Sequence, residues 1–67
     1  MMKLMVNGQP TELPEGTTMR ELVARFELVP EKVAIERNRR LVRAAQYDAV
    51  LADGDQIEIV TFVGGGA

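Results

Sequence analysis

The chain has 67 residues, a net charge of −2, and neither cysteine nor histidine. This length predicts one small domain, and without cysteine there is no disulfide and no thiolate zinc site. Without histidine the chain lacks the usual general base and metal ligand, so a self-contained catalyst is hard to build. The negative charge disfavours nucleic-acid binding. We therefore expect a small domain that is not an enzyme.

The apolar residues are spread along the chain in short runs. None of these runs approaches the roughly 20 apolar residues that a membrane-spanning helix needs. Residues 1–4 lead straight into an alternating pattern and lack the apolar core of a secretory signal. We expect a cytoplasmic protein.

The first predicted elements are two strands joined by Asn7-Gly8. Residues 2–6 alternate, and the apolar side chains at positions 2, 4 and 6 are predicted to point inward. Asn and Gly best tolerate the positive φ angles of a type I′ turn, so Asn7-Gly8 predicts a hairpin. The return strand, residues 9–13, contains Pro10, which has no N–H to donate and predicts a strand at the sheet edge.

The predicted helix begins at Thr18-Met19-Arg20-Glu21, which has the form of a capping box. In this motif the threonine hydroxyl and the glutamate carboxylate accept hydrogen bonds from N–H groups that the helix start leaves free. One apolar stripe at helical spacing is predicted to face the core: Met19, Leu22, Val23 and Phe26. Val29-Pro30 is predicted to end the helical region, because the residue before a proline is driven out of helical backbone angles.

The second half of the chain predicts short strands and turns. Residues 33–35 are expected to form a third strand and Leu41-Val42 a short fourth one, with Asn38 in a left-handed turn conformation between them. Residues 44–47 predict a single helical or 3₁₀ turn, with Tyr47 partly buried.

The last predicted strand follows a tight turn at Asp53-Gly54-Asp55. Before that turn, Val50 and Leu51 are expected to cover the core. Residues 56–60 alternate, so the two isoleucines are predicted to point inward and Glu58 outward.

This order of elements predicts an α+β fold, in which one helix covers one face of a small mixed sheet. Residues 2–6 and 56–60 are expected to pair in parallel, with the helix in the right-handed crossover between them. That arrangement is the ubiquitin-like β-grasp. Residues 1–63 form the predicted single domain, and residues 64–67 a flexible glycine tail that projects beyond a central strand.

Three segments of the chain resemble the thiamine-biosynthesis sulfur carrier (ThiS) family. They are Val33-Ala34-Ile35-Glu36-Arg37-Asn38, Asp53-Gly54-Asp55-Gln56-Ile57-Glu58-Ile59-Val60 and Phe62-Val63-Gly64-Gly65-Gly66. The resemblance extends over the whole chain. It implies a β-grasp carrier that binds no cofactor itself and whose reactive group is the carboxylate of a terminal glycine.

The resemblance also implies a reaction cycle and its partners. An E1-like adenylyltransferase would use ATP to convert the carboxylate of Gly66 into an acyl adenylate. Sulfur from a persulfide, supplied by a cysteine desulfurase, would displace AMP and leave a thiocarboxylate, which thiazole synthase would use as its sulfur donor. Gly64, Gly65 and Gly66 would enter the partners' active sites, because a tail without side chains fits a narrow channel.

Two positions depart from the family pattern. Ala67 follows Gly66, although adenylation needs a free carboxylate on the terminal residue. Either a peptidase removes Ala67, or Ala67 is a remnant of cloning, or the protein as written is inactive. The thiocarboxylate is placed at Gly66 on the assumption that Ala67 is lost. The second departure is Val42-Arg43, which stands where family members often carry Pro-Arg.

The alternation along the last strand predicts a docking surface. Val60 and Phe62 belong to the alternate set opposite to the two core isoleucines, and so to the face away from the helix. Met5 points to the same face. Exposed apolar residues next to a functional tail predict a partner-docking surface made of Val60, Phe62, Val63 and Met5. The alternative is a strand that simply completes its packing.

Two charged clusters have plainer interpretations than binding sites. Four arginines gather in one turn region: Arg37, Arg39, Arg40 and Arg43. They could bind RNA or phosphate or dock on an acidic partner, but no aromatic residues interleave for base stacking, which favours a solvated turn that balances nearby acids. Asp53, Asp55 and Glu58 lack a full set of oxygen ligands for a cation, which favours a turn and the outer face of a strand.

Other functions share this fold and tail. A sibling carrier, such as the small subunit of molybdopterin synthase or a carrier for tRNA thiolation or cysteine synthesis, would use the same tail chemistry. A ubiquitin-like modifier would end in isopeptide bonds to lysines, and a passive β-grasp interaction module would have a tail without function. The segments that carry the resemblance favour the thiazole branch.

Overall fold

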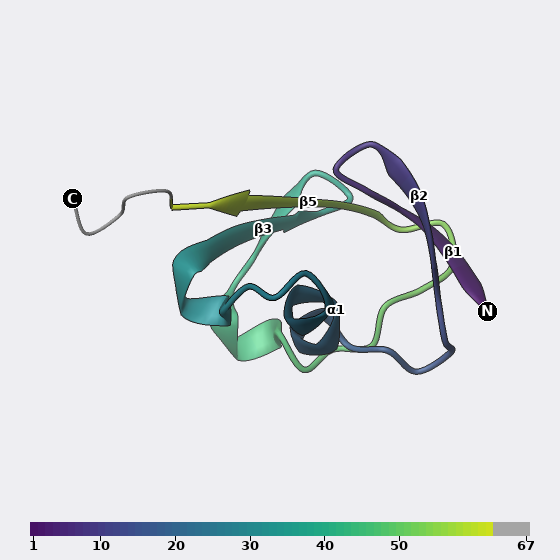
Figure 1. Ribbon diagram of the computed structural model, residues 1–67, viewed down its shortest axis with the longest axis horizontal. Coiled ribbons are helices and arrows are strands. Elements are labelled where there is room, and N and C mark those ends of the chain that lie inside the picture. The colour runs from purple at the N-terminus through teal and green to yellow at the C-terminus, as the bar shows by residue number, and fades with distance from the viewer. Residues whose placement is uncertain (63–67) are drawn as a thin grey trace.

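The computed structural model describes residues 1–62, which form a five-stranded sheet with an α-helix packed against one face (Figure 1). The elements are β1 (Met2–Val6), β2 (Gln9–Leu13), α1 (Met19–Arg25), the 3₁₀ helix η1 (Pro30–Lys32), β3 (Val33–Arg37), β4 (Arg40–Val42), the 3₁₀ helix η2 (Ala44–Gln46) and β5 (Gln56–Thr61). The strands lie in the order β2-β1-β5-β3-β4. Within this described range, no helix is long and apolar enough to cross a membrane.

The first and last strands of the described chain, β1 and β5, lie side by side in the sheet and run parallel. Met5 is opposite Gln56 and Val6 is opposite Ile57. Two parallel strands cannot be joined by a tight hairpin, and the long connection between them contains α1. β2 pairs antiparallel with β1, and β3 pairs antiparallel with β5. The mixed sheet with its one helix confirms the predicted β-grasp.

Both tight hairpins of the sheet are built on residues with positive φ. Asn7 and Gly8 have φ angles of 51° and 79°, which confirms the predicted β1–β2 turn. Asn38 and Arg39 form the β3–β4 turn with φ angles of 54° and 71°, so the left-handed conformation predicted for Asn38 extends to the arginine after it. Pro10 lies in β2 at the sheet edge, where a residue without an N–H is tolerated.

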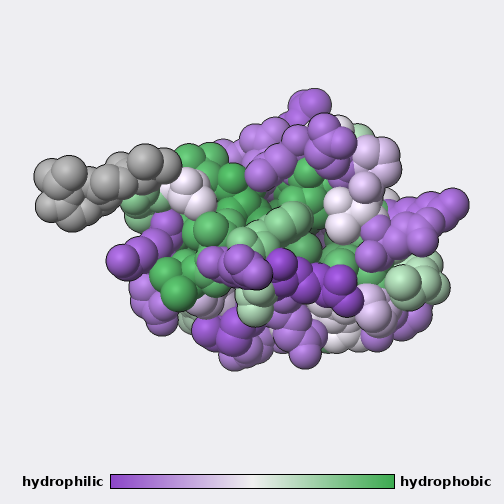
Figure 2. All heavy atoms as spheres, viewed as in Figure 1, coloured by the Kyte–Doolittle hydropathy of each residue, from purple (hydrophilic) through white to green (hydrophobic). Residues whose placement is uncertain are grey.

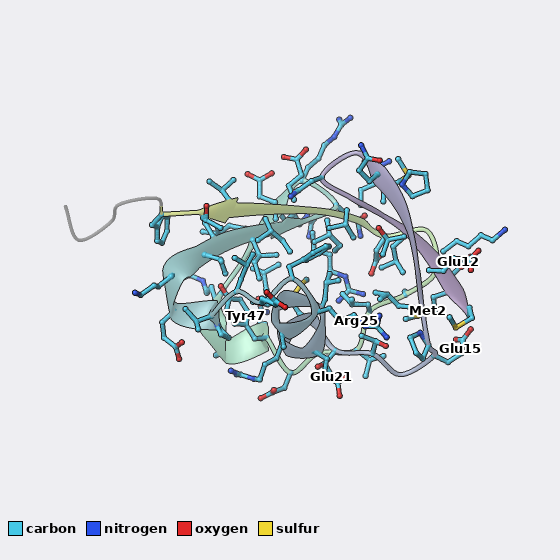
Figure 3. The ribbon with its side chains drawn as sticks, in the orientation of Figure 1. Met2, Glu12, Glu15, Glu21, Arg25 and Tyr47 are labelled. Carbon is cyan, nitrogen blue, oxygen red and sulfur yellow. The ribbon has the colours of Figure 1, made fainter. Side chains whose placement is uncertain are left out.

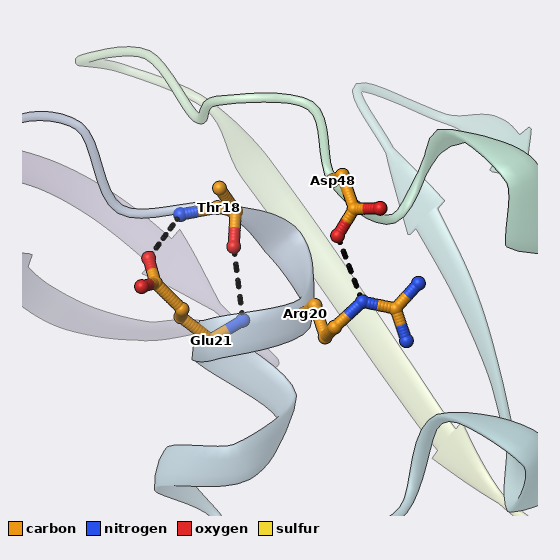
Figure 4. A network of polar contacts seen from close by, with 4 residues as sticks. All are labelled: Thr18, Arg20, Glu21 and Asp48. Carbon is orange, nitrogen blue, oxygen red and sulfur yellow. Dashed lines mark hydrogen bonds and ion pairs between the residues drawn. The ribbon is translucent and has the colours of Figure 1, made fainter.

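The capping box forms at the start of α1. The Glu21 N–H donates to the Thr18 hydroxyl oxygen at 3.1 Å, and the Thr18 N–H donates to the Glu21 carboxylate at 2.9 Å (Figure 4). Arg20 lies between Thr18 and Glu21 in the first turn of the helix. Its Nε donates to the Asp48 carboxylate at 2.8 Å. The start of the helix is thereby tied to the loop that follows η2.

The end of α1 differs from the prediction. The helix ends at Arg25, before Val29-Pro30, because Glu27 takes a φ of 59° and turns the chain away. The Glu27 N–H donates to the Ala24 carbonyl at 2.9 Å, and the Leu28 N–H donates to the Val23 carbonyl at 3.2 Å. These two hydrogen bonds make a Schellman motif.

This early turn changes which side chain reaches the core. Leu28 packs against the core cluster, whereas Phe26 is 45% exposed. The prediction that Phe26 completes the buried stripe of the helix was therefore wrong. The other three members of the stripe, Met19, Leu22 and Val23, are buried as predicted.

The segment after η2 runs along the start of α1. The Met19 N–H bonds to the Ala49 carbonyl and the Leu51 N–H to the Thr17 carbonyl, so residues 49–51 lie against residues 17–19. In extended chain, neighbouring side chains point to opposite sides. Leu51 is therefore buried, whereas Val50 is exposed, which corrects the prediction that both cover the core. Tyr47 is buried beside α1 under the sheet (Figure 3).

Candidate functional site

The candidate site begins at the end of β5, the strand that leads to the glycine run. β5 lies between β1 and β3, and its last residue, Thr61, is opposite Val33. Phe62 then donates its N–H to the Lys32 carbonyl at 3.0 Å. Four residues of the predicted site lie outside the described residues: Val63, Gly64, Gly65 and Gly66. Ala67 lies outside them as well.

The side chain of Asn7 holds the middle of β5. Backbone pairing between β1 and β5 ends where the Asn7 N–H bonds to the Ile57 carbonyl at 2.8 Å. Beyond that point the Ile59 N–H donates to Asn7 Oδ1 at 2.7 Å, and Asn7 Nδ2 donates to the Ile59 carbonyl at 3.3 Å. A side-chain amide offers both an acceptor and donors, so it takes the place of the next peptide group of β1. The turn residue thereby lengthens the parallel ladder towards the tail.

Asn38 and Asp55 hold the start of β5. The Gln56 N–H donates to Asn38 Oδ1 at 2.9 Å, and Asn38 Nδ2 donates to Asp55 Oδ1 at 3.0 Å. The other carboxylate oxygen of Asp55 accepts from the Ala52 N–H at 2.8 Å and from Arg37 Nη2 at 2.8 Å. Two asparagines from two hairpin turns therefore fix β5 from its opposite sides.

These contacts favour the ionised form of Asp55, which is buried. Burial opposes ionisation of the carboxyl. The hydrogen bonds from the Ala52 N–H and Asn38, together with the Arg37 guanidinium, outweigh burial and lower the pKa of Asp55 below its ordinary value. Its oxygens are taken by these donors, and one Asp53 oxygen accepts from the Lys3 N–H at 2.7 Å. The described contacts of Asp53 and Asp55 are those of a turn that is tied to neighbouring backbone.

The predicted docking residues that the structure describes are all exposed. Val60 is 59% exposed, Phe62 53% and Met5 39%. Val60 pairs with Ala34 in β3, and Met5 pairs with Gln56, so Val60 and Met5 share the sheet face away from α1. Apolar side chains also gather where the chain leaves β5 (Figure 2). The outward position predicted for Val60 and Met5 is therefore confirmed, and Phe62 is exposed.

Met5 does not lie beside Val60 on this face. It is level with Gln56, four residues before Val60, which is about 13 Å at the spacing of a strand. Between them lies Glu58, which is directly opposite Glu36 in the β3–β5 pair. Met5 and the two glutamates line a hollow of about 420 Å³. The outer face thus has an apolar end near the last residues of β5 and an acidic centre.

Comparison with known proteins identifies the family. Residues 4–66 match the sequence model of the ThiS family. This chain belongs to the ThiS family. A thiamine biosynthesis protein (ThiS) from Geobacter metallireducens has a similar solved structure, with a TM-score of 0.79 and 33% identity over 97% of this chain and 100% of that one.

Curated relatives of this ThiS-family chain fall into two groups. The sulfur carrier protein ThiS of Bacillus subtilis is 40% identical over 65 residues, which cover 94% of this chain and 98% of the relative. Thiazole synthases of Magnetococcus marinus and Paramagnetospirillum magneticum are 47% and 39% identical over 97% and 98% of this chain. The chain spans only 20% and 21% of their lengths. The family match and the Bacillus relative agree in placing this chain in the ThiS family.

The four arginines of this ThiS-family chain differ in their surroundings. Arg37 is partly buried and paired with Asp55. Arg39, Arg40 and Arg43 are exposed, and none belongs to the ion pairs formed among residues 1–62. The expected balance with nearby acids is therefore limited to Arg37, and the other three are solvated.

Two features of this ThiS-family site were missed by sequence reasoning. Asn7 was read as a turn residue only, and its bonds to Ile59 span 52 positions of the sequence. Glu58 was placed on the outer face, but its pairing with Glu36 depends on the register between β3 and β5. The only signal in the sequence was that both glutamates occupy outward-facing positions of alternating strands.

Proposed function

We propose that this chain carries sulfur to thiazole synthase as a thiocarboxylate on Gly66. The observation that carries the proposal is the ThiS match over residues 4–66, which includes the glycine run. The position of β5 supports it, because this central strand leads directly to that run. The thiazole synthase relatives, each containing a segment similar to this chain, support the choice of partner.

The fixed position of β5 supports delivery of the tail to a partner. Asn7 and Asn38 bind β5 from the hairpin turns on its two sides, and the Phe62 N–H is hydrogen-bonded to the Lys32 carbonyl. A partner that binds the outer face therefore meets the end of β5 at a defined place. Holding a reacting group at a defined place lowers the entropic part of the barrier for its reaction.

The proposed reaction takes place at the carboxylate of Gly66. One carboxylate oxygen attacks the α-phosphorus of ATP, and pyrophosphate leaves. The terminal sulfur of a donor persulfide then attacks the acyl carbon, the bond to AMP breaks, and an acyl disulfide links carrier and donor. A second thiol attacks the donor sulfur of that disulfide, releasing the thiocarboxylate and leaving the two thiols as a disulfide.

The carrier needs few reactive groups of its own for this cycle. The activating enzyme binds ATP and its metal, and the persulfide belongs to a sulfur donor of the cysteine desulfurase type. We propose that the chain itself binds no cofactor and acts as a protein co-substrate. Its own residues present the tail and provide the surface that partners bind.

Ala67 decides whether Gly66 can react. While the Gly66–Ala67 peptide bond is intact, Gly66 has no carboxylate to adenylate. The proposal therefore requires hydrolysis of that bond before activation.

Intact mass spectrometry tests the proposal directly. The full chain and a form ending at Gly66 are each incubated with an E1-like adenylyltransferase, ATP, a cysteine desulfurase, cysteine and a thiol reductant. The form ending at Gly66 should gain the mass difference between one sulfur and one oxygen, and the full chain should not. The Bacillus subtilis sulfur carrier serves as the positive control for the enzymes.

A form lacking residues 65–67 is the matched negative control. It should unfold at the same temperature as the full chain and show no adenylation. If the form ending at Gly66 stays unmodified while the Bacillus carrier is converted, the carrier proposal is wrong.

Complementation separates the related functions. Growth without thiamine of a strain deleted for its own ThiS supports the thiazole branch. Rescue of only a molybdenum-cofactor mutant would favour a sibling carrier. Higher-mass conjugates on target lysines in cell extracts would favour a ubiquitin-like modifier.

A further inference from the structure

Two glutamates face each other at the centre of the outer sheet face. Glu36 in β3 and Glu58 in β5 are direct partners in an antiparallel pair, and both are exposed. Like charges placed directly opposite each other on paired strands destabilise a sheet. The folded chain therefore keeps an unfavourable arrangement at this position.

No cation of the described chain forms an ion pair with these carboxylates. The ion pairs among residues 1–62 have nitrogen–oxygen distances of 2.8 to 3.7 Å, and neither Glu36 nor Glu58 belongs to one. Arg37 follows Glu36, but it binds Asp55 instead. Arg39 lines the same hollow as the two glutamates without pairing with either. The two negative charges are therefore left for solvent or for a partner.

Three apolar residues form a partial rim around this acidic pair, and polar side chains also line the hollow. Leu41 in β4 is paired with Glu36 on the side opposite to Glu58, and it is 66% exposed. Val60 follows Glu58 by two residues on the same face, and Met5 lines the hollow beside both acids. A protein that covers such a rim excludes water from its centre. An ion pair formed there is then stronger than one on an open surface.

We propose that Glu36 and Glu58 together receive an arginine side chain of thiazole synthase when the carrier docks. This inference rests on the proposed function and adds the chemistry of the contact. Arginine suits the place, because its planar guanidinium has five N–H donors and can bond two carboxylates at once. Thiazole synthase is the partner chosen, because two relatives of that name contain a segment similar to this chain.

The proposal predicts opposite effects on the free carrier and on the complex. Neutralising the glutamates removes repulsion in the free chain, so the sheet becomes more stable. The same change leaves the partner's arginine without its acceptors in a covered interface, so binding becomes weaker. A purely structural role of the glutamates would not produce this pair of effects.

The test uses the double variant Glu36→Gln/Glu58→Gln and the wild-type chain with purified thiazole synthase. Calorimetric titration at low and high salt gives Kd, and thermal unfolding gives Tm of the free carrier. The variant should bind about tenfold or more weakly at low salt. Its affinity should also depend less on salt, and its Tm should rise by a few degrees.

Glu15→Gln is the matched control, because it removes one negative charge far from the outer face. Glu15 lies beside Met2, at the end of the molecule away from the end of β5 (Figure 3). It should leave Kd for thiazole synthase close to the wild-type value. Glu58→Lys should weaken binding more than the neutral double variant, because it places a cation against the proposed arginine.

Three results would overturn the inference. The first is a double variant that binds thiazole synthase with wild-type affinity and salt dependence. The second is a fall in Tm of that variant, which would mean that Arg39 of the same chain neutralises the acids. The third is a wild-type chain that does not bind thiazole synthase. Thiocarboxylate formation, measured separately by mass, decides the carrier role in every case.

Discussion

The side-chain amide of Asn7 is hydrogen-bonded to both backbone polar groups of Ile59, at 2.7 Å to its N–H and 3.3 Å to its carbonyl. The first hairpin turn thereby secures the strand that leads to the glycine run. The fold and the proposed delivery of the tail depend on the same residue.

Replacing Asn7 with glycine tests this connection. Glycine tolerates the φ of 51° at this position, so the turn is kept while both hydrogen bonds are lost. Unfolding in urea should show a loss of about 1–3 kcal/mol, from two partly buried hydrogen bonds. Asn7→Asp keeps the acceptor and loses the donor. Its free energy of unfolding should lie between those of the wild type and the glycine variant. A glycine variant within about 0.5 kcal/mol of the wild type would contradict the role of the side chain.

The end of α1 offers a stabilising substitution. Glu27 has a φ of 59°, which is strained for a residue with a Cβ and normal for glycine. Glu27→Gly should raise the free energy of unfolding by about 1 kcal/mol and Tm by roughly 4–8 °C in a domain of this size.

The control for this change is Glu12→Gly in strand β2. The same substitution there should lower Tm, because glycine weakens a strand interior. A Glu27→Gly protein that melts at or below the wild-type temperature would show that the Schellman turn is not strained.

Asp55 should make stability depend on pH. Its folded pKa lies below the ordinary value of 3.8, so its stabilising effect is complete above that value and is lost as the pH falls through the folded pKa. In Asp55→Asn this contribution is absent at every pH. The gap in unfolding free energy between wild type and variant should therefore be largest near neutral pH and shrink below about pH 4.

Chemical denaturation at a series of pH values measures that gap, because the other carboxylates titrate alike in both proteins and cancel. A gap that stays constant down to pH 2 would mean that the contacts of Asp55 do not favour its ionised form.

Phe62 should matter more for binding than for folding. Phe62 is 53% exposed and follows the last residue of β5, so Phe62→Asp removes little packing from the core. The variant should keep a Tm within a few degrees of the wild type and bind the activating enzyme and thiazole synthase more weakly.

Val50→Asp is a suitable control for Phe62→Asp. Val50 is exposed to a similar degree and lies in the segment that runs along the start of α1, away from the outer sheet face. Its substitution should leave both affinities unchanged. Unaltered affinity of Phe62→Asp for both enzymes would argue against the docking surface.

Sequence patterns predicted those features that depend on neighbouring residues. The Asn7-Gly8 turn, the capping box from Thr18 to Glu21 and the alternation of β5 all follow from contacts within a few positions. The same local rules failed at Phe26, because the left-handed turn at Glu27 has no marker such as glycine in the sequence. Leu28 then takes the core position that helical spacing assigns to Phe26.

By itself, the sequence determined the class of fold, the order of its elements, the glycine run and the outward side of the last strand. Only the tertiary structure decided that Asn7 reaches Ile59 and that Glu36 meets Glu58 beside Leu41. The physical reason is register. Hydrogen bonding between strands selects which side chains become neighbours, and no local pattern specifies the offset between two strands that are distant in the chain.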